Sequence, residues 1–167
     1  LTHKAIDADL ITRVNTRTLA LIFQKNDLKV NQLGLTFAGK LNFLHNGYEM
    51  DIHLNSKQAD LYQLISAFPP EYLDWSKKTI VKGQADLGLY LKGKYIAETN
   101  EMPDLGIKLQ IRDGYIAYEN VKLPVSHLRG NAAIELMHLD PEQLHLKLDS
   151  FSFQLDKDYV QASWESY

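Results

Sequence analysis

Apolar and polar residues alternate with a period of two along much of the chain, and this alternation constrains the fold more than any other feature. It is most regular in 48–54, 85–91 and 107–111, where every second side chain is apolar. Such alternation is typical of a β-strand with one buried and one wet face. One-sided burial of this kind favours antiparallel pairing. Further strands are expected near 4–11, 13–23, 28–43, 128–137, 144–155 and 159–165.

Short polar segments predict tight connections between these strands. Asn46-Gly47 separates two alternating runs and readily supplies the positive φ angles of a type I′ turn. Asp113-Gly114 can supply the same positive φ angles and predicts a second turn, and Asp140-Pro141 predicts a type I turn. Because strands joined by short turns pair side by side, the sequence predicts a meandering sheet.

One segment, 57–68, has the periodicity of a helix. Ser56 is a candidate N-cap, and Pro69 ends the segment. We therefore expect a mainly β fold, in which a curved and largely antiparallel meandering sheet carries one amphipathic α-helix on its apolar face. The apolar residues of this helix lie at i, i+3, i+4 and i+7 and form one stripe: Leu61, Leu64, Ile65 and Phe68.

An internal repeat is indicated by two segments, 28–37 and 146–155, whose apolar residues coincide. In both segments the alternation changes phase, after Val30 and after Leu148. A phase change within a strand is typical of a β-bulge or a strand crossing. The length of 167 residues suits a single β-rich domain or repeat unit over 1–167. Since the chain starts at Leu1 and shows no signal peptide, we expect it to be a processed chain or a fragment excised from a longer protein.

Composition and motifs argue against several functional classes. The formal net charge of −3 lacks the basic excess of a nucleic-acid-binding domain. The absence of cysteine excludes disulfides, thiolate metal sites and cysteine nucleophiles. The sequence has neither a glycine-rich phosphate loop nor a G-x-S-x-G nucleophile elbow. We therefore expect no enzymatic activity, no catalytic residue, no cofactor and no metal site.

Two groups of polar residues come closest to catalytic or metal-binding chemistry. Ser126 and His127 follow Asp113 in the sequence, but a catalytic triad depends on geometry, and positions near strand ends account for these residues. His138 and His145 flank the proline-containing turn. A histidine pair without a third ligand is a weak basis for a metal site. An enzyme whose site is assembled from scattered residues remains an open alternative.

The order of strand, turn and helix motifs along the chain is more informative. The segments concerned are Leu28–Phe43, Asn46–Ile52, Asp60–Pro69, Gly83–Leu87, Leu91–Tyr95, Met102–Pro103, Asp113–Ile116 and Leu123–Leu128. This order resembles the AsmA-like family of Gram-negative envelope proteins, in particular its Bacteroidetes-type members. The motifs are structural patterns and contain no catalytic residues, so no site residue is carried over from the family.

The resemblance implies a non-enzymatic protein of outer-membrane biogenesis. It would lie in the periplasm, anchored to an envelope membrane by a segment outside this chain. It would contribute an apolar β-groove for phospholipid transport between membranes, with acyl chains and neighbouring repeats of the same protein as partners, and with no nucleic acid. The candidate lipid-facing residues are the apolar members of two alternating runs: Tyr48, Met50, Ile52, Leu54, Leu87, Leu89 and Leu91.

The residues themselves are compatible with such a groove. A helix of about twelve residues spans roughly 18 Å, which is too short to cover the apolar face of eight or more strands. Sheet curvature, neighbouring repeats or acyl chains would have to cover the remainder. Two other functions stay open from sequence alone. One is a lipocalin-like or β-sandwich module that binds a small apolar ligand, and the other is a purely structural envelope scaffold.

Overall fold

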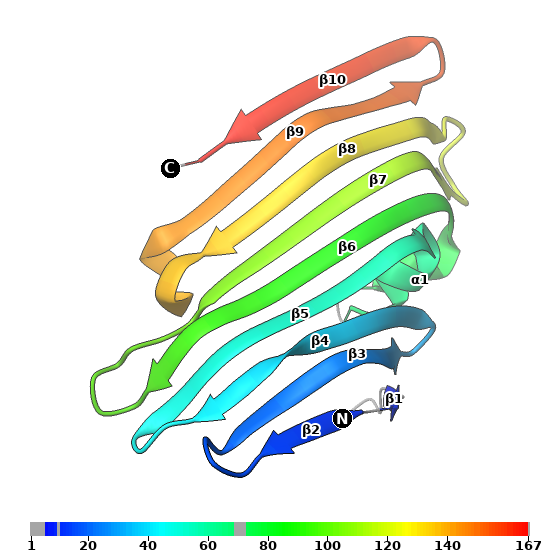
Figure 1. The fold of residues 1–167 in the computed structure, drawn as a ribbon. Coiled ribbons are helices and arrows are strands. Elements are labelled where there is room, and N and C mark those ends of the chain that lie inside the picture. Colours follow the sequence, from blue (N-terminus) through cyan, green and yellow to red (C-terminus); the bar gives the residue numbers. More distant parts are fainter. Residues whose placement is uncertain (1–5, 10, 69–72, 167) are drawn as a thin grey trace.

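The computed structural model describes residues 6–9, 11–68 and 73–166, which form one antiparallel sheet and a single short α-helix (Figure 1). The mainly β fold with one helix is thus confirmed. The strands are β1 (Ile6–Asp9), β2 (Thr12–Asn15), β3 (Ala20–Val30), β4 (Leu33–Phe43), β5 (Gly47–Asp60), β6 (Thr79–Ile96), β7 (Asp104–Tyr118), β8 (Val125–Leu136), β9 (Leu144–Leu155) and β10 (Asp158–Glu165). From β3 to β10 each strand pairs with its neighbours in the chain, and β1 and β2 both pair with β3.

Two of the three predicted turns connect consecutive strands. The segment around Asn46 joins β4 to β5, with Phe43 opposite Tyr48 at the base of the hairpin. Neither Asn46 nor Gly47 has a positive φ, so the connection is in place but the predicted type I′ geometry is wrong. The segment around Pro141 joins β8 to β9 through two 3-10 helices, η3 (Met137–Leu139) and η4 (Pro141–Gln143). The side chain of Asp140 accepts the backbone N–H of Glu142 at 3.0 Å and so caps the second of these helices.

The third predicted turn, Asp113-Gly114, is wrong. These residues lie inside the continuous strand β7, where Ile111 is opposite Gly130 and Gly114 is opposite Leu128. Asp113 has a φ of 49°, the positive value that the sequence pattern predicted. Because β6 and β8 pair with β7 on both sides of this point, the positive φ produces a β-bulge and not a chain reversal.

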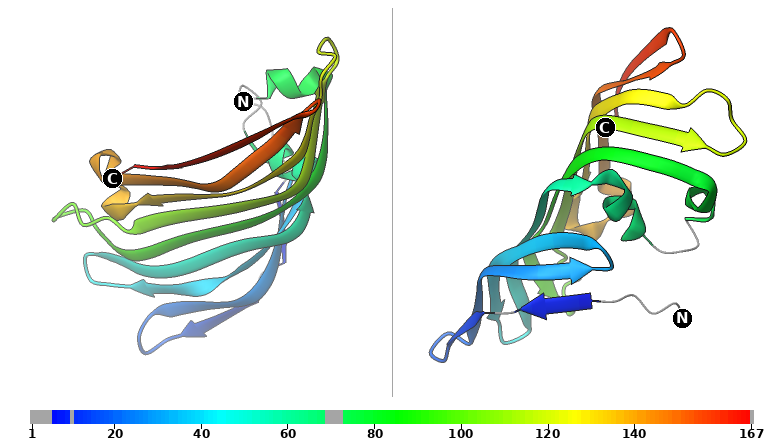
Figure 2. Two further views of the ribbon diagram at one scale, coloured as in Figure 1. Left: turned by 90° about the horizontal axis from the view of Figure 1, so that it is seen from above. Right: turned by 90° about the vertical axis from the view of Figure 1, so that its right-hand side faces the viewer.

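Register shifts of this kind recur in every strand pair from β5 to β10. At these points the spacing of inward-facing residues changes from two to three, as from Ser56 to Ala59 and from Leu148 to Phe151. A β-bulge bends its strand and increases the local twist. The sheet is accordingly curved, and α1 lies on its concave side (Figure 2). The bulge in β5 thus keeps apolar residues on that side at both ends of the bend, with Leu54 before it and Ala59 after it.

The side chain of Asp86 stabilises the bulge in β5. Its carboxylate accepts the backbone N–H of Gln58 in the bulge of β5 at 2.6 Å. It also accepts two hydrogen bonds from the guanidinium of Arg112 on β7, at 2.7 and 2.9 Å. The bonds from Arg112 and Gln58 favour the ionised form and lower the pKa of Asp86 to about 2.

Because the folded-state pKa of Asp86 lies below its unfolded value, its contribution to stability is present above about pH 4 and is lost as the pH falls towards 2. We therefore expect Asp86→Asn to lower the melting temperature at pH 7 and the difference from the parent protein to narrow on acidification. Thermal melts followed by circular dichroism between pH 7 and 2 check this. Asp158→Asn, which neutralises an exposed carboxylate of β10, is the control. A difference from the parent that stays constant with pH would contradict the role of Asp86.

The helix α1 (Leu61–Ser66) is shorter than the predicted 57–68. Residues 57–60 belong to β5, because its pairing with β6 continues to Asp60 opposite Gln84. The predicted N-cap, Ser56, instead donates its hydroxyl to the carbonyl of Gly34 at 2.7 Å. The N-cap is Asp60, whose carboxylate accepts the N–H of Tyr62. The proline predicted to end the helix, Pro69, lies outside the described residues, which resume at residue 73 with η2 (Asp74–Lys78).

The core lies between α1 and the concave face of β4, β5 and β6. Leu61 and Leu64 are the buried residues of the helix, whereas Phe68 at the end of the predicted stripe is exposed. Packing of the helix on the apolar face is therefore confirmed over a shorter segment. The buried cluster consists of Leu33, Leu35, Ala59, Leu61, Leu64, Val81 and Ala85.

The two segments of the predicted internal repeat have different structures. The first, 28–37, crosses the turn at Asn31 that connects β3 to β4. The second, 146–155, lies within the single strand β9, where the phase change after Leu148 is a bulge. The matching apolar positions therefore do not correspond to a structural repeat, and the strands expected over 13–23 and 28–43 are divided differently, into β2, β3 and β4.

Candidate functional site

The concave face of the sheet carries three cross-strand rows of apolar side chains, which we call the apolar trough. The first row runs from β4 to β9 through Phe37, Leu54, Leu89, Ile107, Ile134 and Leu146. The second runs from β5 to β9 through Ile52, Leu91, Leu105, Leu136 and Leu144. The third runs from β6 to β10 through Leu87, Leu109, Ala132, Leu148 and Trp164.

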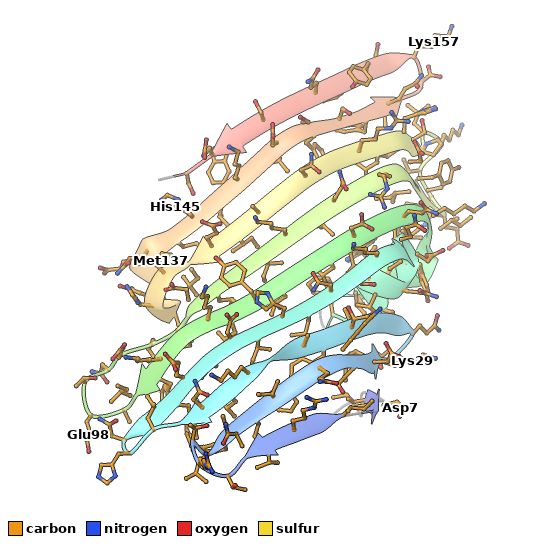
Figure 3. All side chains as sticks on the ribbon, viewed as in Figure 1. Asp7, Lys29, Glu98, Met137, His145 and Lys157 are labelled. Atoms are coloured by element: carbon orange, nitrogen blue, oxygen red, sulfur yellow. The ribbon has the colours of Figure 1, made fainter. Side chains whose placement is uncertain are left out.

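None of these side chains is charged, and all except Trp164 are purely hydrocarbon. The opposite face of the same strands has a different character. One row of that face passes through Lys40, Asp51, Lys92 and Asp104, so that opposite charges alternate from strand to strand. Farther along the sheet, Lys147 of β9 and Glu165 of β10 form an ion pair at 3.5 Å. Figure 3 shows side chains standing on the strands of the sheet. The sheet therefore has one apolar and one charged face.

Only part of the trough is covered. The helix α1 packs against β4, β5 and β6 near one end of these strands. Over β7 to β10, no second sheet and no further α-helix among residues 6–9, 11–68 and 73–166 lies on the apolar face (Figure 2). Trp164 in the third row is accordingly 54% exposed, whereas Leu64 on the inner side of α1 is 5% exposed. The open part of the trough is an apolar surface of the kind that marks an interaction site.

The seven residues predicted to face lipid all lie on the concave side of β5 and β6. Register brings Ile52 beside Leu91 and Leu54 beside Leu89, near the middle of the trough. Met50 lies opposite Gly93, and Leu87 begins the third row.

Tyr48 lies at the end of the strands, where its ring is 5.6 Å from that of Phe43 and 6.4 Å from that of Tyr95. These three rings form an aromatic border to the trough. The two tyrosine rings are amphipathic, which suits the boundary between an apolar surface and water.

Sequence reasoning missed the larger part of the trough, which lies on β7, β8, β9 and β10. The alternation of Ile107, Leu109 and Ile111 marks a strand, but it does not show which residues stand beside them. The register of β8 and β9 supplies that information by placing Ile134 and Leu146 in line with Ile107. Trp164 carries no alternating signal of its own that identifies its neighbours.

The polar groups considered for catalysis are engaged elsewhere. The imidazole of His127 is 3.3 Å from the hydroxyl of Ser126 in β8, where His127 is exposed and Ser126 is half-buried. The carboxylate of Asp113, however, is bound by Arg129 at 2.6 Å. His138 is 3.5 Å from Asp104. Within the described residues, no group of three or more His, Asp and Glu side chains could hold a metal ion.

One pocket is separate from the trough. Its volume is about 890 Å³, and it lies near the N-terminal edge of the sheet, between β1, β3, β4 and β5. Its lining includes Lys25, Lys29 and Lys57 together with Asp7 and Asp27. These opposite charges are mixed within one open depression, so the pocket favours neither an anion nor a cation.

No helix in the described part of the chain combines the length and the apolar content needed to cross a bilayer. Comparison of the chain with protein-family models, with curated proteins and with solved structures gives no match. What the trough binds must therefore follow from its own geometry and chemistry.

Proposed function

We propose that the apolar trough binds phospholipid acyl chains and that the protein contributes, without catalysis, to the movement of phospholipid between membranes of a bacterial cell envelope. The observation that carries this proposal is the continuity of uncharged side chains across β4 to β9 on a face that stays open over its second half. The resemblance of the sequence motifs to the AsmA-like family supports a periplasmic location and a role in outer-membrane biogenesis.

The dimensions of the trough suit an acyl chain. Neighbouring strands are about 4.8 Å apart, so the row from β4 to β9 extends roughly 24 Å. An acyl chain in one leaflet extends roughly 15 Å, half the thickness of the hydrocarbon core. The chain would bury apolar surface against each row, while the open side of the trough leaves the polar headgroup in water. Burial of apolar area stabilises such a complex by about 25 cal/mol per Å².

The repetition of the rows favours movement over tight binding. An acyl chain that crosses the strands meets a similar aliphatic side chain at each step of about 4.8 Å. No charged group lies in the three rows, and the indole N–H of Trp164, at the end of the third row, is their one hydrogen-bonding group. Neighbouring positions along the aliphatic part of the rows are therefore close in energy. This arrangement suits a conduit better than a pocket selective for one small ligand, which needs a few precisely placed polar groups.

The single open sheet also bears on the alternative of a lipocalin-like or β-sandwich module. A lipocalin-type barrel closes on itself, and a sandwich buries its apolar face against a second sheet. In the described residues the strand path runs from β1 to β10 without closing, and there is one sheet. Neither architecture is present there.

We expect Leu89→Lys to reduce the lipid recovered with the purified protein severalfold. The substitution places an ammonium group in the central row of the trough, where acyl chains would have to desolvate it. A lysine stem can extend out of an open trough, so the protein should remain folded. Mass spectrometry of lipid extracts, alongside thermal melts, checks both expectations.

Asn55→Lys provides the matched control, because Asn55 is exposed and lies on the opposite face of the neighbouring strand β5. It adds the same charge without entering the trough. Equal lipid recovery from Leu89→Lys, Asn55→Lys and the parent protein would contradict lipid binding in the trough. Global unfolding by Leu89→Lys, with no lipid recovered from the parent, would show that this face is ordinary core and that the protein is a structural scaffold.

A further inference from the structure

One rim of the sheet exposes a group of large apolar side chains outside the trough. We call it the η2 rim; it is formed by η2, the start of β6, the end of β7 and the loop 119–124. The backbone N–H of Glu119 donates to the carbonyl of Lys78 at 2.9 Å, which holds the loop beside η2. Thr79 is opposite Tyr118 in the β6–β7 ladder. The exposed apolar residues of this rim are Trp75, Ile80, Tyr118, Val121 and Leu123.

These apolar side chains are exposed and do not belong to the buried cluster under α1. Val121 is 54% exposed and Leu123 is 47% exposed, both in the loop between β7 and β8. Trp75 is on η2 and is also exposed, although tryptophan has a large apolar surface to bury. A cluster of apolar residues on a rim, as distinct from single scattered ones, marks an interaction surface.

Charge distinguishes this rim from the opposite one. The η2 rim carries the exposed Lys78, Lys82 and Lys122, and among its described side chains Glu119 supplies the opposing charge. The opposite rim consists of the β2–β3, β4–β5, β6–β7 and β8–β9 connections. Its acidic residues are Glu98, Glu101, Asp140 and Glu142, against one arginine, Arg17. An anionic surface would therefore be attracted to the η2 rim and repelled by the opposite rim.

We propose that the η2 rim is a membrane-docking surface, which inserts Trp75, Val121 and Leu123 into the interface of an anionic bilayer while Lys78, Lys82 and Lys122 contact the lipid headgroups. Tryptophan and tyrosine favour the headgroup level of a bilayer, because one end of each side chain is apolar and the other is polar. Lysines beside them add attraction to anionic lipid.

This docking is a separate property from lipid binding in the trough. It would place the rim of the sheet against a bilayer, so that lipid could pass between the membrane and the concave face. The two tryptophans of the chain allow the two properties to be measured independently, since Trp75 lies on the η2 rim and Trp164 lies in the third row of the trough.

The experiment uses two single-tryptophan variants of the full chain. Trp164→Phe retains the rim reporter, and Trp75→Phe retains the trough reporter. Each is titrated with vesicles of phosphatidylcholine, with and without phosphatidylglycerol, while the emission maximum and quenching by brominated acyl chains are recorded. We expect a blue shift and quenching of Trp75 that depend on phosphatidylglycerol and are removed by high salt.

Variants of the rim test which residues carry the binding. Lys78→Gln combined with Lys122→Gln should weaken binding to the anionic vesicles on the order of tenfold. Val121→Ser combined with Leu123→Ser should weaken it severalfold. Leu139→Ser is the matched control, because Leu139 is 37% exposed on the opposite rim. Circular dichroism should show all these surface variants to be folded.

The outcomes separate docking from trough binding. A response of Trp75 without one of Trp164 supports docking and counts against the trough as a lipid site. A response of Trp164 alone, or binding that is equal with and without phosphatidylglycerol, overturns the docking proposal. Equal loss of binding in Leu139→Ser and in the Val121/Leu123 variant also overturns it. Binding of the η2 rim to a protein in place of vesicles would do the same.

Discussion

Leu64→Asp is expected to unfold the protein or to lower its free energy of unfolding by several kcal/mol, because an unpaired carboxylate would be buried between α1 and the sheet. Leu64 is 5% exposed and belongs to the cluster that joins the helix to β4, β5 and β6. Since single domains are stable by only about 5–15 kcal/mol, a loss of this size is a large share of the total. Urea denaturation followed by circular dichroism measures it.

Tyr62→Asp is the control for this change, because Tyr62 is on the same helix and is 44% exposed. A surface substitution of this kind should change the free energy of unfolding by about 0.5 kcal/mol or less. If the two variants had equal stability, the helix would not be docked on the concave face, and the core would have to lie elsewhere.

Gly83→Ala is expected to lower the free energy of unfolding by about 2–4 kcal/mol, the second large effect. Gly83 has a φ of 125° at the register shift between β6 and β7, a conformation that residues with a Cβ rarely adopt. A Cβ at this position would also lie 2.7 Å from the Cα of Gly114. Neither strand could move away without breaking the hydrogen bonds of the ladder on both sides. The substitution should therefore disrupt both the bulge and the local curvature of the sheet.

Gly34→Ala tests whether this cost belongs to the bulge or to any glycine in the sheet. No atom lies within 4 Å of a Cβ placed on Gly34, and its φ is not positive. Since alanine restricts the unfolded chain more than glycine does, this variant should be as stable as the parent or more stable by up to about 1 kcal/mol. Chemical denaturation of both variants measures their free energies of unfolding. A similar decrease in Gly34→Ala and Gly83→Ala would refute the special role of Gly83.

The alternation of apolar residues was sufficient to predict most strands, because a half-buried sheet imposes that pattern directly. Two strands, β5 (Gly47–Asp60) and β6 (Thr79–Ile96), contain the alternating runs from which they were predicted. The pattern was ambiguous at 57–60, where a bulge in β5 changes the spacing from two to three. A spacing of three followed by the apolar residues of α1 is also the pattern of a longer helix. Only the pairing with β6 distinguishes such a helix from a bulged strand that is followed by a short helix.

The sequence was sufficient to predict an apolar face on β5 and β6, but not how far the trough extends across the other strands. The seven residues of β5 and β6 follow from their own alternation, since both strands present one apolar face. Which residues of β7, β8 and β9 stand beside them depends on the register of the strand pairs. One-residue bulges at Asp113 and Ser150 shift this register. Asp113-Gly114 illustrates the difficulty, because the same positive φ serves a hairpin turn and a bulge, and the flanking strands determine which one forms.

The sequential strand order has a consequence for how such a protein can vary in size. From β3 to β10 each strand contacts mainly the strands before and after it in the chain, so stability is a sum of local terms, as in a linear array. Insertion or deletion of one hairpin would lengthen or shorten the sheet by about 9.6 Å, two strand spacings. The remaining pairs would keep their register, so the span of the protein is adjustable in steps of one hairpin without redesign of the rest.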